Sequence, residues 1–227
     1  MNRRIFLTIL WISFVAYAFV GAPPQDSDTT DLIWRLASGN WQGLNPAVVA
    51  LFNAMGIWPM VYGCLVLTDG HEQKVPAWPF AIAAFALGAF ALLPYLILRT
   101  PNRRFTGPKS RLIQVVESRW IGGLLAVSAT AILGYGLWAG DWPNLIDQWR
   151  SSRFIHVMGL DFVLLWLLVP TLLGDDMARR QLDSPGTFWL TALIPLVGPA
   201  SYLMLRPPLS IELAGREQSS AASSSIQ

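Results

Sequence analysis

The chain has 227 residues, of which 53% are hydrophobic and only 13% are charged, and its mean hydropathy is +0.44. This composition excludes an intrinsically disordered protein, and the charged share is well below the roughly 25% of soluble domains. The formal net charge of +2 gives no reason to expect a nucleic-acid partner. We therefore expect an all-α, polytopic transmembrane bundle in a lipid bilayer, because helices satisfy their own backbone hydrogen bonds there.

Six stretches approach the roughly 20 apolar residues that a helix needs to cross a bilayer. They are residues 5–20, 46–67, 78–98, 120–138, 154–173 and 187–205. Together they predict one transmembrane domain over residues 1–213 with about six spans, or five if the first stretch is cleaved or does not cross. Residues 214–227 are small and polar, which predicts a disordered tail.

The first apolar stretch has two interpretations. Asn2-Arg3-Arg4 ahead of an apolar run resembles a signal peptide, and Val20-Gly21-Ala22 offers small residues to a peptidase. However, Pro23-Pro24 follow at once and the run stays bulky to its end. A retained membrane anchor is the prediction, and cleavage is the alternative.

The polar segment between the first two stretches contains a possible amphipathic helix. Thr30-Asp31 can cap a helix that carries Leu32, Ile33 and Trp34. Such a helix suits the headgroup region of a bilayer. A plain loop that carries tryptophan is the alternative.

The distribution of Lys and Arg bears on topology. Six of them lie in residues 99–119, which predicts a cytoplasmic position for this loop. With six spans both termini would then lie outside, whereas the N-terminus lies inside if the first stretch does not cross, so its side stays open. No internal repeat is evident in the sequence, and the halves show no inverted symmetry.

Asp161 is the most informative single residue. It lies about two turns into the fifth stretch, where a carboxylate costs roughly 2.5–3.5 kcal/mol on insertion scales and should face the bundle. It could form a proton, cation or pigment-ligand site, or it could join two helices by a hydrogen bond. Asn53 in the second stretch is the best candidate for its partner.

His156 begins the same stretch as Asp161 but lies about 140° away around the helix, which disfavours a direct relay between the two. His71 should lie on the same side of the membrane as His156. Because His71 is in a loop, a haem held by this pair is not favoured, and a surface histidine is the simpler interpretation. The cofactor, if one exists, stays unknown.

Two charged segments are further candidate sites. In the segment 174–180, Asp175 should face Arg179 and Asp176 should face Arg180, which predicts a self-paired connector rather than a divalent-ion site. The loop 99–119 offers a basic surface for anionic lipid or a protein partner, or serves topology alone. Its candidate residues are Arg103, Arg104, Lys109 and Arg111.

Three segments carry a family resemblance: residues 44–59, residues 88–95, and residues 160–165 followed by 175–180. They resemble uncharacterised multi-pass membrane proteins of cyanobacteria and chloroplasts. The resemblance implies a thylakoid or plasma membrane, but it assigns no activity and no functional residue.

Two functions are therefore expected as alternatives. The sequence contains no nucleotide-binding loop, nucleophile elbow, metalloprotease motif or Cys-x-x-Cys, so no catalytic or metal-binding residue is assigned and an enzyme is disfavoured. The first function is a non-catalytic integral membrane protein that assists or scaffolds a photosynthetic complex. Glycines of 120–138 permit close helix contact, within the protein or with another subunit. The alternative is a small transporter or membrane enzyme centred on Asp161.

Overall fold

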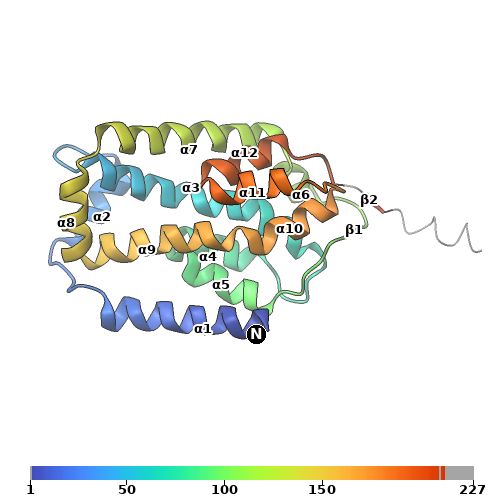
Figure 1. Cartoon of the computed structure of the whole chain (residues 1–227), viewed down its shortest axis with the longest axis horizontal. Helices are drawn as coiled ribbons and strands as arrows, with labels where there is room; N and C mark the ends of the chain where they lie inside the picture. The colour runs from blue at the N-terminus through green and yellow to red at the C-terminus, as the bar shows by residue number, and fades with distance from the viewer. Residues whose placement is uncertain (1, 210, 213–227) are drawn as a thin grey trace, which may run out of the picture.

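The computed structural model describes residues 2–209 and 211–212, and nearly all of their regular secondary structure is helical (Figure 1). Four long helical segments lie side by side along the molecule. They are α1 (Arg3–Ala16) with its π-helical turn η1 (Tyr17–Gly21), α3 (Pro46–Asp69), α7 (Arg119–Ala139), and α9 (Arg153–Leu168) continued by α10 (Pro170–Arg179).

Shorter elements complete the fold. Two amphipathic helices, α2 (Thr29–Ser38) and α8 (Trp142–Ser151), lie at one end. The remaining elements are η2 (Gly70–Glu72), α4 (Trp78–Leu87), α5 (Ala89–Leu98), β1 (Phe105–Thr106), α6 (Arg111–Val116), α11 (Pro185–Leu193), α12 (Val197–Leu205) and β2 (Ile211–Glu212). The strands β1 and β2 form a two-residue parallel pair at the opposite end. We call the ends the α2/α8 end and the β1/β2 end.

The four long segments are apolar and long enough to cross a membrane. Their bounds are Arg3–Gly21, Pro46–Asp69, Arg119–Ala139 and Arg153–Arg179. They agree with four of the six predicted stretches. The predicted helix in the first polar segment also exists, as α2. The predicted tail at 214–227 lies outside the described residues.

The six-span prediction is not confirmed, because the stretch 78–98 is a helical hairpin. The chain reverses at Gly88, whose φ of +50° suits glycine, and α4 packs against α5. The two ends of the hairpin lie together, since the side chain of Gln73 accepts from Thr100 N (2.8 Å) and donates to Thr100 O (2.6 Å). Hydropathy counts apolar residues and does not register this reversal of direction.

The stretch 187–205 is a second hairpin. It breaks between α11 and α12 around Pro195 and Leu196, whose φ is +57°. Its last helix ends at Leu205, and the next residue, Arg206, donates to Val116 O (3.0 Å) at the β1/β2 end. The second hairpin therefore also enters and leaves at the β1/β2 end (Figure 1).

The two hairpins belong to an internal repeat, so the prediction of no repeat is wrong. Each half contains a long helix, a short amphipathic helix, a second long helix and a hairpin, in the same order and direction. The equivalent helices α3 and α9 begin 107 residues apart. With this offset, residues 95–101 (YLILRTP) align with residues 202–208 (YLMLRPP) and share five of seven residues.

The contacts follow the same repeat. Helix α1 packs on α5 as α7 packs on α12, and each hairpin also contacts the long helix of the other half, through the pairs α5–α9 and α12–α3. The glycines of α7 serve these internal contacts: a Cβ at Gly122 would meet the backbone of α12, and a Cβ at Gly136 would lie 2.5 Å from Ala50 Cβ.

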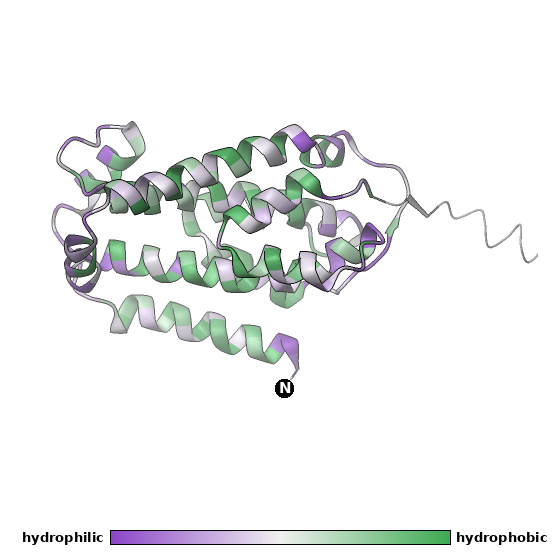
Figure 2. Ribbon diagram, turned by 45° about the horizontal axis from the view of Figure 1, so that its top comes forward, coloured by the Kyte–Doolittle hydropathy of each residue, from purple (hydrophilic) through white to green (hydrophobic). Residues whose placement is uncertain are grey.

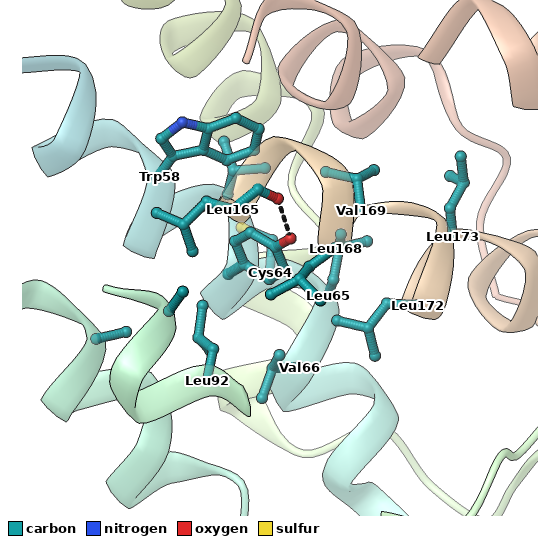
Figure 3. Close-up of a cluster of buried hydrophobic side chains, with 14 of the residues drawn as sticks. Trp58, Cys64, Leu65, Val66, Leu92, Leu165, Leu168, Val169, Leu172 and Leu173 are labelled. Atoms are coloured by element: carbon teal, nitrogen blue, oxygen red, sulfur yellow. Dashed lines mark hydrogen bonds between the residues drawn. The ribbon is translucent and has the colours of Figure 1, made fainter. Parts of the chain in front are cut away.

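The core lies where α3, α5 and α9–α10 meet, and its side chains come from both halves (Figure 3). Leu65, Leu92, Leu165 and Leu172 are almost completely buried there. In contrast, apolar residues cover much of the outside of the long helices (Figure 2). An outward apolar surface of this kind is what a lipid environment requires.

Candidate ligand site at Asp161

A cavity of about 620 Å³ lies between η1, α2, α3, α9 and the tip of the α4–α5 hairpin. Its wall is mainly apolar, and Asp161 supplies a carboxylate to it. Arg153, at the start of α9, lines it as well. Its size falls in the range of pockets that hold drug-sized ligands. Apolar residues of the wall include Val15, Phe52, Gly56, Phe85, Phe154 and Met158.

Asp161 holds the tip of the hairpin. Its side chain is buried, and Oδ1 accepts a hydrogen bond from Ala89 N (2.8 Å), the first residue of α5. A Cβ at position 88 would clash with the carboxylate, so glycine is required there both by this contact and by its φ. The first helical amide after the reversal thus points at a buried carboxylate.

Asn53 is not joined to Asp161 by a hydrogen bond among the described residues. Its side-chain amide donates instead to Val49 O (2.8 Å), one turn earlier in α3. The expected pairing fails because Asn53 satisfies its donor within its own helix. The partner of Asp161 is instead the backbone amide of Ala89. This residue follows the chain reversal at Gly88, which the sequence did not indicate.

His156 is buried rather than on the surface, and both of its ring nitrogens have partners. Nε2 lies 2.9 Å from Tyr17 Oη, and Nδ1 lies 2.8 Å from Trp149 O. The ring also stacks on Trp149 with centroids 4.0 Å apart. His71 stacks on Phe105 near the β1/β2 end, whereas His156 lies near the α2/α8 end, so the expectation that both share one side is wrong.

Beside His156, Arg153 joins α9 to the segment after η1. Its Nε donates to Pro23 O (2.8 Å) and its backbone N to Pro24 O (3.3 Å). These contacts hold the wall of the cavity near the α2/α8 end. Asp161 lies eight residues further along the helix, about 12 Å deeper at 1.5 Å per residue.

A buried network of ion pairs occupies the β1/β2 end, and we call its first part cluster A. Asp69 binds Arg99 (2.7 Å) and Arg179 (2.9 Å), and Tyr95 Oη donates to it (2.7 Å). Arg99 also pairs with Asp175. Cluster A therefore joins α3, α5 and α10.

Its counterpart in the other half, cluster B, is centred on Asp176. Asp176 binds Arg180 (2.8 Å) and Arg206 (3.2 Å), and Tyr202 Oη donates to it (2.7 Å). In both clusters the tyrosine follows the aspartate by 26 residues and the arginine follows it by 30. Cluster B joins α10 to α12.

These clusters revise the prediction of a self-paired connector. The pair of Asp176 with Arg180 at i,i+4 is confirmed. However, Arg179 pairs with Asp69 and Asp175 pairs with Arg99, so the segment binds distant parts of the chain rather than itself. Sequence spacing indicates contacts within one helix, whereas these partners meet only after the hairpins fold.

The predicted basic surface is partly used inside the protein. Lys109 pairs with Glu117 (2.6 Å), and Arg103 approaches Asp175 (3.6 Å) while its side chain stays 79% exposed. Arg104 and Arg111 are exposed near the β1/β2 end. Burial raises the pKa of Glu117, but Lys109 and Arg180 outweigh it, so this pKa lies below its ordinary value.

The repeat shows which parts of the site the scaffold needs. At the 107-residue offset, Asp161 corresponds to Ala54 and Gly88 corresponds to Pro195. The second hairpin therefore reverses without a carboxylate at the equivalent position, and Leu196 beside its break is completely buried. The Asp–Tyr–Arg clusters occur in both halves, whereas Asp161 is a feature of one half.

Over the described residues, no group of three or more His, Cys, Asp or Glu side chains could hold a metal ion. Comparisons of the chain with family models, with curated proteins and with solved structures found no match. The resemblance to cyanobacterial and chloroplast proteins therefore stays a prediction. The candidate site depends on the geometry of this chain alone.

Sequence reasoning found Asp161 but missed Gly88 and both Asp–Tyr–Arg clusters. A signal for the clusters was present, since the two aspartates precede Tyr-Leu-x-Leu-Arg-x-Pro at identical spacing. A signal for the reversal at Gly88 was weaker, because an isolated glycine is common inside transmembrane helices.

Proposed function

We propose that this chain is an integral membrane protein that binds a small apolar molecule in the cavity at Asp161, as a carrier or a membrane enzyme does. The observation that supports this most is the carboxylate in an apolar cavity where the two halves meet. Ionisable residues within membrane segments usually serve function, and transporter sites commonly lie at discontinuous helices between repeats. The repeat supports the proposal as well, because the second hairpin turns without a carboxylate at the equivalent position.

We further propose that the chain crosses the membrane four times and that both hairpins are re-entrant from the β1/β2 end. Charge supports this topology. Over the described residues, three basic residues lie at the α2/α8 end, namely Arg35, Arg150 and Arg153. Twelve lie at the β1/β2 end: Arg3, Arg4, Lys74, Arg99, Arg103, Arg104, Lys109, Arg111, Arg119, Arg179, Arg180 and Arg206. The positive-inside rule then places the β1/β2 end, with the N-terminus, in the cytoplasm.

Native mass spectrometry of protein extracted from its own membrane tests the binding function. We expect one co-purifying molecule of drug size, held through purification. Gly56 lines the cavity, and a Cβ added to it would have no atom within 4 Å, so Gly56→Leu should fill the cavity and remove this molecule. Gly134 on α7 has the same free space and is exposed, which makes Gly134→Leu the matched control. Equal occupancy in both variants would refute binding in this cavity.

The role as an assembly or scaffold factor for a photosynthetic complex is the alternative proposal. The resemblance of residues 44–59, 88–95 and 160–165 supports it, together with the thylakoid or plasma membrane that it implies. Of the two contacts that these glycines permit, Gly122 and Gly136 make the one within the chain. Native electrophoresis of gently solubilised membranes decides this alternative: co-migration with photosystem subunits supports it, and migration as a free monomer contradicts it.

A further inference from the structure

One oxygen of Asp161 lacks a protein partner in the described part of the chain. Oδ1 accepts from Ala89 N, but no hydrogen bond or ion pair of the described residues engages Oδ2. This oxygen packs against Gly88, where it occupies the space that a side chain would take, and Asp161 and Gly88 both line the cavity. A carboxylate oxygen beside a mainly apolar wall gains much from a donor, since that wall offers few donors of its own.

The basic groups nearest along the chain are engaged elsewhere. Both nitrogens of His156 are used by Tyr17 and Trp149. Arg153 donates to Pro23 O at a point about two turns nearer the α2/α8 end than Asp161. The arginines of clusters A and B lie at the opposite end, paired with Asp69, Asp175 and Asp176.

The remaining wall determines the rest of the ligand. Phe52, Phe85 and Phe154 supply aromatic surface, and Val15 and Met158 supply aliphatic surface. A ligand that fills about 620 Å³ must therefore be mostly apolar, and the polar lining residues that it can meet are Asp161 and, nearer the α2/α8 end, Gln25, Thr29 and Arg153. An anionic group beside an ionised Asp161 is disfavoured, because two like charges would meet in a medium of low dielectric constant.

We infer that the ligand of this cavity is an apolar amine whose ammonium group binds Oδ2 of Asp161 at the tip of the α4–α5 hairpin while its apolar part fills the space between η1, α3 and α9. This inference rests on the proposed function and names the chemical class of the ligand. The ammonium supplies both the missing charge and the missing donor, whereas an alcohol supplies the donor alone.

Three probes with one chain length test the inference: decylamine, decanol and decanoate. The full-length protein is placed in nanodiscs of phosphatidylcholine, and its unfolding temperature is followed against the concentration of each probe, because a ligand stabilises the state that it binds. For the native protein we expect apparent affinity to fall from decylamine to decanol by about tenfold, and we expect no stabilisation by decanoate. Asp161→Asn should abolish the advantage of the amine and leave the binding of decanol unchanged.

The variants separate the two levels of the proposal. If decylamine and decanol bind alike in both the native protein and Asp161→Asn, and Gly56→Leu removes both, the amine inference is overturned and the binding cavity stands. If Gly56→Leu and Gly134→Leu respond to all probes as the native protein does, the cavity itself is refuted. If the advantage of decylamine over decanol is as large in Asp161→Asn as in the native protein, it comes from a non-specific effect of the amine on the bilayer. That result would likewise overturn the inference.

Discussion

At the scale of single residues, the molecule contains buried carboxylates in two different settings. Asp69 and Asp176 each bind two arginines and one tyrosine, so their charges and lone pairs are satisfied. The Asp161 carboxylate, in contrast, accepts one hydrogen bond, from the backbone amide of Ala89. A fully paired carboxylate holds elements together, whereas a partly paired one retains the capacity to bind something else.

Glu117 makes the loop after α5 sensitive to acid. Its lowered pKa, caused by Lys109 and Arg180 against the opposing effect of burial, means that its charge stabilises the fold above its ordinary pKa near 4.5. This contribution is lost as the pH falls through the lower pKa of the folded state. We expect the unfolding temperature to drop as the pH falls below the ordinary pKa of 4.5, and Glu117→Gln to reduce that drop.

The measurement is differential scanning calorimetry of both proteins in the same nanodiscs at each pH. Glu117→Gln should already be less stable at neutral pH, because Arg180 and Lys109 lose a charged partner. An identical drop in the two proteins would show that other carboxylates control the acid response.

At the scale of elements, the four long helices and the short amphipathic helix α2 could be predicted, and the two hairpins could not. The difference is physical. A continuous run such as residues 46–67 contains enough apolar residues to cross, whatever its neighbours do. The run 78–98 contains as many, but Gly88 permits a reversal, and contacts distant in sequence, such as Gln73 with Thr100, hold the ends together.

The candidate site was likewise only partly predictable from the sequence. Asp161 could be identified because it is a lone carboxylate in an apolar stretch. Its partner was not visible, since the amide of Ala89 becomes free only when α5 starts afresh at the reversal. The long-range pairs of Arg99 and Arg179 were likewise hidden, because spacing along one helix says nothing about a second helix.

The hairpin tip predicts a strong coupling between Gly88 and Asp161. Gly88→Ala places a Cβ against the carboxylate and forces alanine into a conformation suited to glycine, so it should lower the free energy of unfolding by about 1–3 kcal/mol. In an Asp161→Ala background the clash disappears and the strain of φ remains. The cost of Gly88→Ala should therefore be smaller there.

A double-mutant cycle in a mild denaturant series measures this coupling. Gly63→Ala serves as the matched control, because it lies on α3 with open space around a Cβ. If the costs of Gly88→Ala and Asp161→Ala simply add, the two groups do not contact at the tip, and the site is not built as described.

At the scale of the whole molecule, the repeat and the hairpins predict a different topology from six spans. Lys74 and Arg104 flank the α4–α5 hairpin, so both lie at the β1/β2 end. A spanning helix over 78–98 would put them on opposite sides. With a buried Cys64 that can be replaced by alanine, single cysteines at these exposed positions report their side directly.

Labelling with a membrane-impermeant maleimide in sealed vesicles of both orientations shows from which side of the membrane each cysteine reacts. Lys74→Cys and Arg104→Cys should react from the same side, and Asn40→Cys, at the end of α2, from the other. Labelling of Arg104→Cys together with Asn40→Cys, from the side opposite Lys74→Cys, would restore the continuous span and contradict the re-entrant hairpin.

The central claim is that two repeats form the scaffold, in which cluster A joins the two halves and cluster B joins α10 to α12, and that Asp161 is a ligand group of one repeat. Unfolding temperatures of Asp161→Asn and Asp176→Asn, measured side by side, test it most directly. Asparagine at 161 keeps an oxygen for Ala89 N and removes a costly charge, so we predict an unchanged or higher temperature. Asp176→Asn leaves Arg180 and Arg206 without their partner and should cost about 3–5 kcal/mol. A comparable loss of stability in both variants would mean that Asp161 belongs to the scaffold, and would contradict the claim.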